Sequence, residues 1–213
     1  MKKRTKKLAL AAGIFGALTL GGVTAYLTDY DSAVNEFTVG KVDIELQEPD
    51  WKPEEHETME PGDEIEKDPQ IQNTGVNDAF VYLEVSIPRA DVIAADTNGT
   101  RLDKKEQELF SFEASTSWTK LEERVSGSNM IYVYTYNKIL EPQETTEALF
   151  EQVNFLNIIE GQLDTQQLEI PVRAYAIQTA HTGDNAGSVI KQATAAYQKY
   201  VNQNLGDDGQ VTE

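Results

Sequence analysis

The sequence predicts an all-β protein built on an antiparallel β-sandwich or barrel. Two observations carry this prediction. Apolar and polar residues alternate with a period of two through the centre of the chain, which is typical of half-buried strands. Two turns that begin Glu60-Pro61 and Glu141-Pro142 each precede an extended segment, as expected where tight turns join short strands.

The chain begins with the features of an export signal. Met1–Lys7 carries five positive charges, and Leu8–Val23 is uncharged and mostly apolar. Small residues ending at Ala25 then suit a signal peptidase, so we expect cleavage between Ala25 and Tyr26. A retained transmembrane anchor is the alternative, but the apolar stretch of about 16 residues is shorter than the roughly 20 that a spanning helix needs. We therefore predict a signal peptide over residues 1–25, contact with a membrane only before cleavage, and a secreted protein.

The composition fits one exported domain over residues 26–205, followed by a disordered tail over residues 206–213. Cleavage would remove five of the 18 basic residues and none of the 36 acidic ones, so the net charge would change from −18 to −23. Such a charge disfavours binding to nucleic acid and to anionic membranes. The sequence contains no cysteine, which excludes disulfides and thiol catalysis, so stability must come from the core.

Three segments show the strand pattern most clearly. Val42–Leu46 alternates apolar and charged residues, and Val81–Ile87 repeats the alternation until Pro88, where we expect the strand to end. Leu168–Thr179 is a longer candidate, and Pro171 within it predicts an edge strand or a bulge. These strands would form the sandwich.

Three other stretches do not fit a sandwich. Glu48–Glu60 is rich in acidic residues and proline, which predicts a mobile loop. Residues 89–117 are polar and resemble an insertion, with a short helix expected over Asp103–Phe110. Residues 186–203 place apolar side chains at helical spacing after Ser188, a good N-cap, so we predict a C-terminal helix.

A series of short segments follows in a fixed order along most of the predicted mature chain. The segments are Ala25-Tyr-Leu-Thr-Asp29, Asn35-Glu-Phe-Thr-Val-Gly40, Val42-Asp-Ile-Glu-Leu46, Glu48-Pro-Asp-Trp51, Met59-Glu-Pro-Gly-Asp63, Ile65-Glu-Lys-Asp-Pro69, Ile71-Gln-Asn-Thr-Gly75, Ala79-Phe-Val-Tyr-Leu83 and Ala174-Tyr-Ala-Ile-Gln178. In this order they resemble the TasA/camelysin family of exported Gram-positive proteins. The resemblance implies a jelly-roll sandwich, a signal peptide processed by a dedicated signal peptidase, and assembly into fibres of a biofilm matrix.

The resemblance also implies that the N-terminal segment of one subunit completes the sheet of its neighbour. Residues 26–39 are compatible with such a donor strand, because their apolar residues lack the strict alternation that would fix a register within the same subunit. An added strand gains main-chain hydrogen bonds and buries alternate side chains. From the residues alone, an ordinary first strand with a frayed terminus fits equally well. The candidate assembly residues are Leu27, Tyr30, Val34, Phe37 and Val39.

The camelysin branch of the family is described as proteolytic, so a metalloprotease is the second hypothesis. The sequence has only two histidines, His56 and His181, and no His-Glu-x-x-His helix to hold zinc. His56 lies among glutamates and is a weak candidate metal ligand, although acidic loops of this kind are usually solvated. No Gly-x-Ser-x-Gly turn is present either. We therefore assign no catalytic residue and no cofactor, and we leave the enzyme question open while favouring a protein without catalysis.

The export signal together with the family resemblance favours a secreted structural subunit that self-assembles in the extracellular matrix or at the cell surface. Its expected partners are other copies of itself and, during export, a signal peptidase. Participation of an accessory matrix or anchoring protein is left open. The third hypothesis is a monomeric surface binding module, which would keep its N-terminal segment paired within the same subunit.

Overall fold

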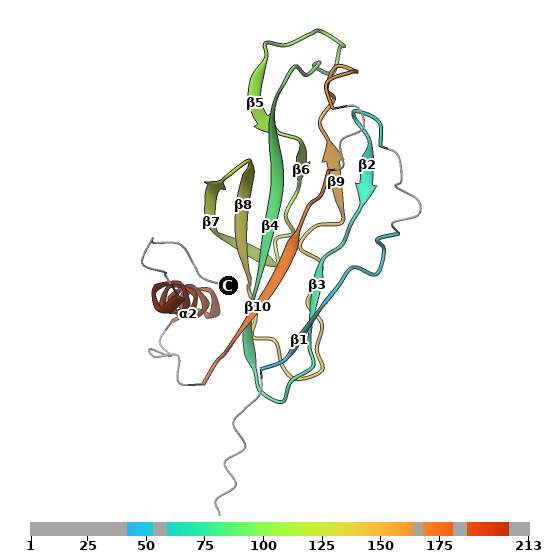
Figure 1. Ribbon diagram of the computed structural model, residues 1–213. Coiled ribbons are helices and arrows are strands. Elements are labelled where there is room, and N and C mark those ends of the chain that lie inside the picture. The colour runs from blue at the N-terminus through green and yellow to red at the C-terminus, as the bar shows by residue number, and fades with distance from the viewer. Residues whose placement is uncertain (1–41, 53–58, 164–167, 181–186, 205–213) are drawn as a thin grey trace, which may run out of the picture. The chain divides into compact units, whose positions relative to one another are not determined.

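The computed structural model describes residues 42–52, 59–163, 168–180 and 187–204. The chain divides between Val39 and Gly40, and every described residue belongs to the second unit, Gly40–Glu213. All strand pairs within the described residues are antiparallel, and they form three sheets (Figure 1). The predicted all-β class is confirmed, and the architecture fits a β-sandwich. The jelly-roll connectivity stays a prediction.

The largest sheet is built around a single long strand, β4 (Ala79–Val92), which runs through its centre (Figure 1). Its order is β10 (Val172–Gln178), β4, β8 (Asn129–Tyr136) and β7 (Trp118–Ser126), and β5 (Lys105–Glu108) pairs with the far end of β4. The other two sheets are β2 (Glu64–Glu66), β9 (Gln152–Phe155) and β6 (Phe110–Phe112) in that order, and the pair β1 (Ile44–Gln47) and β3 (Gln70–Asn73).

β4 buries side chains on both of its faces. The predicted apolar face is confirmed, because its alternate residues are inaccessible to solvent and belong to the main core. The opposite face carries Phe80 and Tyr82, which are also buried and belong to a second, smaller cluster under the helix. The main core combines residues of all three sheets, among them Ile65, Ile71, Val81, Leu83, Val85, Ile87, Phe110, Leu149, Phe150 and Val153.

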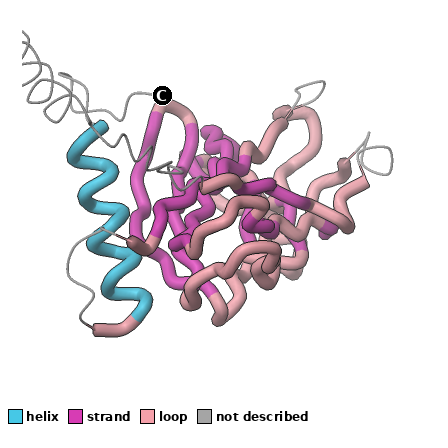
Figure 2. Tube along the Cα trace, turned by 90° about the horizontal axis from the view of Figure 1, so that it is seen from below, coloured by secondary structure: helices cyan, strands magenta, loops and turns pink. Residues whose placement is uncertain are grey.

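The predicted C-terminal helix is present as α2 (Val189–Asn204). Ser188 caps it as expected, since the Ser188 hydroxyl oxygen accepts a hydrogen bond from the amide of Lys191 at 3.3 Å. Figure 2 shows α2 lying along one side of the strands. Its small residues Ala193 and Ala196 are buried against Phe80, which allows the helix backbone to approach the sheet closely.

The predicted helical insertion is wrong. Residues expected to form a helix over Asp103–Phe110 instead form β5 and the start of β6. β5 pairs with the end of β4 in the register Arg89↔Glu108 to Val92↔Lys105. A cross-strand ladder with an available edge has therefore overridden the helical propensity of the local sequence.

The expectation that Pro88 ends its strand is also wrong, because β4 continues to Val92. Pro88 lacks an N–H donor, so it fits only where its nitrogen faces no ladder partner. On that side of β4, the amide of Ser86 donates to the carbonyl of Pro171 at 2.9 Å, just before β10 begins. Pro88 lies two residues further on and faces Leu109, whose amide donates to the Pro88 carbonyl at 2.8 Å. The Leu109 carbonyl accepts the Leu156 amide at 2.8 Å, so it needs no donor from Pro88 and the strand continues.

The expectation for Pro171 is confirmed. β10 lies at the end of its sheet and begins immediately after this proline. The apolar residues predicted to share one face, from Leu168 to Ala176, all pack against the main core. Both predicted Glu-Pro turns form as well: the amides of Asp63 and Glu144 donate to the carbonyls of Glu60 and Glu141 at 3.1 Å.

Candidate functional site

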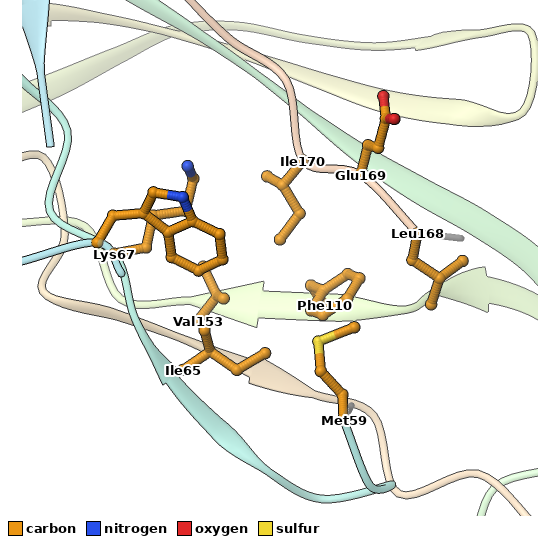
Figure 3. A pocket seen from close by; sticks show the side chains of 9 residues that line it. Met59, Ile65, Lys67, Phe110, Val153, Leu168, Glu169 and Ile170 are labelled. Atoms are coloured by element: carbon orange, nitrogen blue, oxygen red, sulfur yellow. The ribbon is translucent and has the colours of Figure 1, made fainter. Parts of the chain in front are cut away.

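The described residues contain an apolar pocket of about 290 Å³ at the start of the segment that leads into β10. We call it the Trp51 pocket, after one of the side chains that line it. Figure 3 shows the pocket, in which Met59, Phe110, Leu168 and Ile170 turn their apolar side chains toward the middle. The lining consists of Trp51, Met59, Ile65, Lys67, Phe110, Val153, Leu168, Glu169 and Ile170.

The floor and the walls of the Trp51 pocket differ in exposure. Ile65, Phe110 and Val153 form a buried floor, with 3 % or less of each side chain exposed. The wall residues Trp51, Met59, Leu168 and Ile170 are only partly buried although they pack against the main core. The pocket is thus an opening through which the apolar core reaches solvent, a feature that marks binding surfaces more often than bare packing defects.

The Trp51 side chain, which forms part of the pocket wall, packs against the ion pair of Lys67 and Glu48. The Lys67 ammonium lies 2.6 Å from a Glu48 carboxylate oxygen and 5.1 Å from the centroid of the Trp51 ring. Lys67 is 8 % exposed, so both the charge pair and the cation–π contact are largely shielded from water. Lys67 therefore fixes Trp51 from the inside of the pocket.

A second set of hydrogen bonds fixes the turn that carries Trp51. Asp68 is almost fully buried, at 2 % exposed, and one of its carboxylate oxygens accepts the Asp50 amide at 2.9 Å. The other oxygen accepts the side-chain amide of Gln70 at 3.0 Å. The Trp51 amide closes the turn by donating to the Glu48 carbonyl at 3.2 Å. These bonds hold residues 48–51 against the chain that links β2 and β3, so this part of the predicted mobile loop is fixed.

A buried asparagine organises the next stretch of chain. Asn73 is inaccessible to solvent, and its side-chain amide donates to the carbonyls of Asn77 and Leu140 at 2.9 and 3.0 Å. Its side-chain oxygen accepts the amide of Gly75 at 3.0 Å. Asn73 therefore ties the end of β3 to the second Glu-Pro turn.

The residues singled out from the sequence as functional lie outside the described part of the chain. This holds for the cleavage residues Ala25 and Tyr26, for both histidines His56 and His181, and for the tail over residues 206–213. It also holds for the assembly residues Leu27, Tyr30, Val34, Phe37 and Val39. The structure brings none of them to a described site, and their roles stay predictions.

Neither a metal centre nor a membrane-spanning helix is found among the described residues. Among residues 42–52, 59–163, 168–180 and 187–204, no group of three or more His, Cys, Asp or Glu side chains is arranged to hold a metal ion. In the same ranges, no helix has the length and apolar character that crossing a bilayer requires.

Comparison with known families gives a match over the first part of the chain. A family model described as camelysin metallo-endopeptidase matches residues 1–106, the N-terminal half of the chain. The chain belongs to the TasA/camelysin family. No curated protein and no solved structure matches it. The family description implies a metal, and the described residues offer no donor set that fits one.

Both sides of the contacts around Trp51 lie in the region that matches the TasA/camelysin family. The matched region includes Glu48, Asp50 and Trp51 together with their partners Lys67 and Asp68. Two of the ordered segments seen in the sequence, Glu48–Trp51 and Ile65–Pro69, are therefore physically joined by these contacts.

The sequence did not identify the pocket itself. Its lining comes from five separate stretches of chain: Trp51, Met59 to Lys67, Phe110, Val153, and Leu168 to Ile170. Only Trp51 carried a signal, since an isolated tryptophan in an acidic, proline-rich segment suggests an anchor at an interface or a contact with the core. The remaining residues read as ordinary strand positions.

Proposed function

We propose that this protein is a secreted structural subunit that assembles with other copies of itself into extracellular matrix fibres. Each subunit would add its N-terminal segment, residues 26–39, as a strand to a neighbour. No cofactor and no chemical turnover are needed for this role. The site of action would be the extracellular matrix or the cell surface, after removal of residues 1–25.

The observation that carries the proposal is the opening of the apolar core at the Trp51 pocket, beside the start of β10. Among the described strands, β10 lies at the end of its sheet, and Arg173 is the only charged residue within it. An end strand with so little charge lacks the usual protection against pairing with another chain. A neighbouring segment can therefore add main-chain hydrogen bonds at β10 and bury side chains in the core opening.

The test compares two chains over a concentration series, by size-exclusion chromatography and negative-stain microscopy. One chain begins at Tyr26 and the other at Gly40, the first residue of the unit that contains the whole described fold. We expect regular filaments from the first chain and monomers with the same thermal unfolding transition from the second. Filaments from both chains would remove the donor role of residues 26–39. Monomers from both would favour a monomeric surface binding module.

The family description favours a second candidate function, a metal-dependent endopeptidase. Its ligands would have to include residues outside the described ranges, where both histidines lie. The test measures zinc content and casein cleavage by the chain that begins at Tyr26, with and without a chelator. Stoichiometric zinc, together with cleavage that is lost in His56→Ala and His181→Ala variants, would establish the enzyme.

A further inference from the structure

The loop that joins β4 to β5 carries an asparagine with unusual chemical reactivity (Figure 1). Asn98 is the only asparagine in the sequence that is followed by a glycine, Gly99. Both residues are exposed to solvent. Gly99 has a φ of 78°, and a Cβ built onto it would meet no atom within 4 Å. The space beside the peptide bond between the two residues is therefore open.

An asparagine that precedes glycine can lose its side-chain amide to its own main chain. The Gly99 nitrogen gives up its proton and forms a bond to Cγ of Asn98, the bond from Cγ to Nδ2 breaks, and ammonia leaves. Water then opens the resulting five-membered imide, which yields either aspartate or isoaspartate. Glycine favours the attack because it has no Cβ in the way and its backbone turns freely.

Three hydrogen bonds to Asp96 hold this loop in a closed turn. The Gly99 amide donates to the main-chain carbonyl of Asp96 at 2.9 Å. The amides of Asn98 and Thr100 both donate to one carboxylate oxygen of Asp96, at 2.9 and 2.7 Å. The nitrogen that would attack Asn98 is thus engaged by the turn, so the turn has to open before the reaction can begin.

The charge of Asp96 adds to this restraint. Hydrogen bonds, above all the one from the Thr100 amide, lower the pKa of the Asp96 carboxyl below its ordinary value. Asp96 is therefore an anion at neutral and alkaline pH. The reactive form of the Gly99 nitrogen is itself negatively charged, and a neighbouring carboxylate disfavours it.

We propose that Asn98 is a modification site, converted to aspartate and isoaspartate by its own main chain at a rate that the Asp96 turn controls. The inference is independent of the proposed assembly. Each conversion adds one negative charge to a chain whose net charge is −18. Isoaspartate also inserts a methylene group into the main chain, so the turn loses its spacing. The Leu102 amide, which donates to the Ala94 carbonyl at 2.9 Å, should then exchange its hydrogen faster.

A single tryptic peptide reports on the reaction. Cleavage after Arg89 and Arg101 releases Ala90–Arg101, in which Asn98 carries the only side-chain amide. The folded full chain is incubated in mildly alkaline buffer made with heavy-oxygen water, and then digested in ordinary water. We expect the peptide to gain one heavy oxygen in place of its amide nitrogen and to separate into an aspartate and an isoaspartate form. The same peptide, isolated and without the turn, should react about 10-fold faster.

Variants of Asp96 test the control by the turn. Asp96→Ala removes the acceptor of two amides together with the charge, so the folded chain should react about 10-fold faster than the wild type. Asp96→Asn keeps an acceptor oxygen without the charge and should react at an intermediate rate. Thermal unfolding, measured for both variants, should match the wild type. Asn129 is partly exposed but is followed by Met130, and as the internal control it should keep its amide.

Each part of the inference has an outcome that would overturn it. If Asn98 keeps its amide in the folded chain under conditions that convert the isolated peptide, it is not a modification site of this protein. Equal rates in the folded wild type, the Asp96→Ala variant and the peptide would remove the control by the turn. A product without heavy oxygen would exclude the route through the imide.

Discussion

The hydroxyl of Tyr82 in β4 donates a hydrogen bond to the main-chain carbonyl of Ala193 in α2, at 2.8 Å. The helix returns a similar bond, because the Tyr197 hydroxyl donates to a carboxylate oxygen of Glu122 on β7 at 2.8 Å. The two tyrosine rings lie side by side, with centroids 5.5 Å apart. The helix is thus fixed to the sheet by two crossed hydrogen bonds around an apolar contact.

Removing the hydrogen bond from Tyr82 to Ala193 should weaken the attachment of α2 to the sheet while its apolar contacts stay in place. Tyr82→Phe keeps the ring and its packing but loses the hydroxyl, so we expect the free energy of unfolding to fall by about 0.5–1.5 kcal/mol. Urea unfolding measures the loss, and hydrogen exchange should show faster exchange of the α2 amides. An unchanged free energy of unfolding, with unchanged exchange in α2, would mean that this bond does not hold the helix.

The buried hydroxyls of Tyr82 and Tyr197 should make the fold less stable at high pH. Burial raises the pKa of Tyr82, and burial together with the hydrogen bond to Glu122 raises the pKa of Tyr197. A tyrosine whose folded pKa exceeds its unfolded value of about 10 stabilises the fold fully below pH 10 and loses that contribution as the pH rises further. We therefore expect the free energy of unfolding to fall above pH 10 by up to about 1.4 kcal/mol per pH unit for each tyrosine.

Urea titrations at closely spaced pH values, with tyrosinate absorbance recorded in parallel, measure this slope. The variant Tyr82→Phe should show a shallower decline, because it has one buried hydroxyl fewer. A decline that begins well below pH 10 would point to other groups.

The ion pair beneath Trp51 should contribute more than one on the surface. The side chains of Lys67 and Glu48 are 10 % and 20 % exposed and their charged atoms lie 2.6 Å apart, so Lys67→Met leaves a poorly solvated carboxylate without its partner. We expect a loss of about 1–3 kcal/mol in the free energy of unfolding and a shift of the Trp51 fluorescence. The matched control is Lys104→Met, whose ion pair with Asp91 is 56 % and 61 % exposed and should cost at most about 1 kcal/mol. Equal losses for the two variants would contradict this account.

The second Glu-Pro turn stores strain that a glycine would relieve. Gln143 has a φ of 69°, a left-handed conformation that costs a residue with a side chain of order 1 kcal/mol or more, whereas Gly62 holds the matching position of the first turn at φ 93°. We expect Gln143→Gly to raise the melting temperature and Gly62→Ala to lower it. The Cβ added in Gly62→Ala would meet only Asn157 at an ordinary 4.0 Å, so its effect would come from the backbone. Shifts of the same sign would exclude strain as the cause.

Features that depend only on neighbouring residues could be predicted from the sequence. The alternation of apolar and polar residues in Val81–Ile87 predicted a strand, and Ser188 predicted the start of a helix. Both appear as expected. The helix expected over Asp103–Phe110 failed for the opposite reason. Its residues favour a helix locally, but Arg89–Val92 offers them a ladder of main-chain hydrogen bonds that the local sequence does not reveal.

The pocket could not be predicted because it has no local pattern. Phe110 and Val153 meet through the pairing of β6 with β9, in the register Phe110↔Phe155 to Phe112↔Val153, and Leu168 joins them from the segment before β10. Each position reads as a core residue when taken alone. Only the arrangement of the strands leaves space between them.

The place of β10 in the sheet also governs when the molecule can fold. Val172 of β10 pairs with Val85 of β4 across about 90 residues of intervening chain, and such long-range pairing slows folding. During synthesis, a ribosome that has already released β4, β8 and β7 has still to make the strand that completes their sheet. The β10 side of β4 therefore stays uncovered until β10 itself has been made, and a chain that ended before Val172 would leave it uncovered permanently.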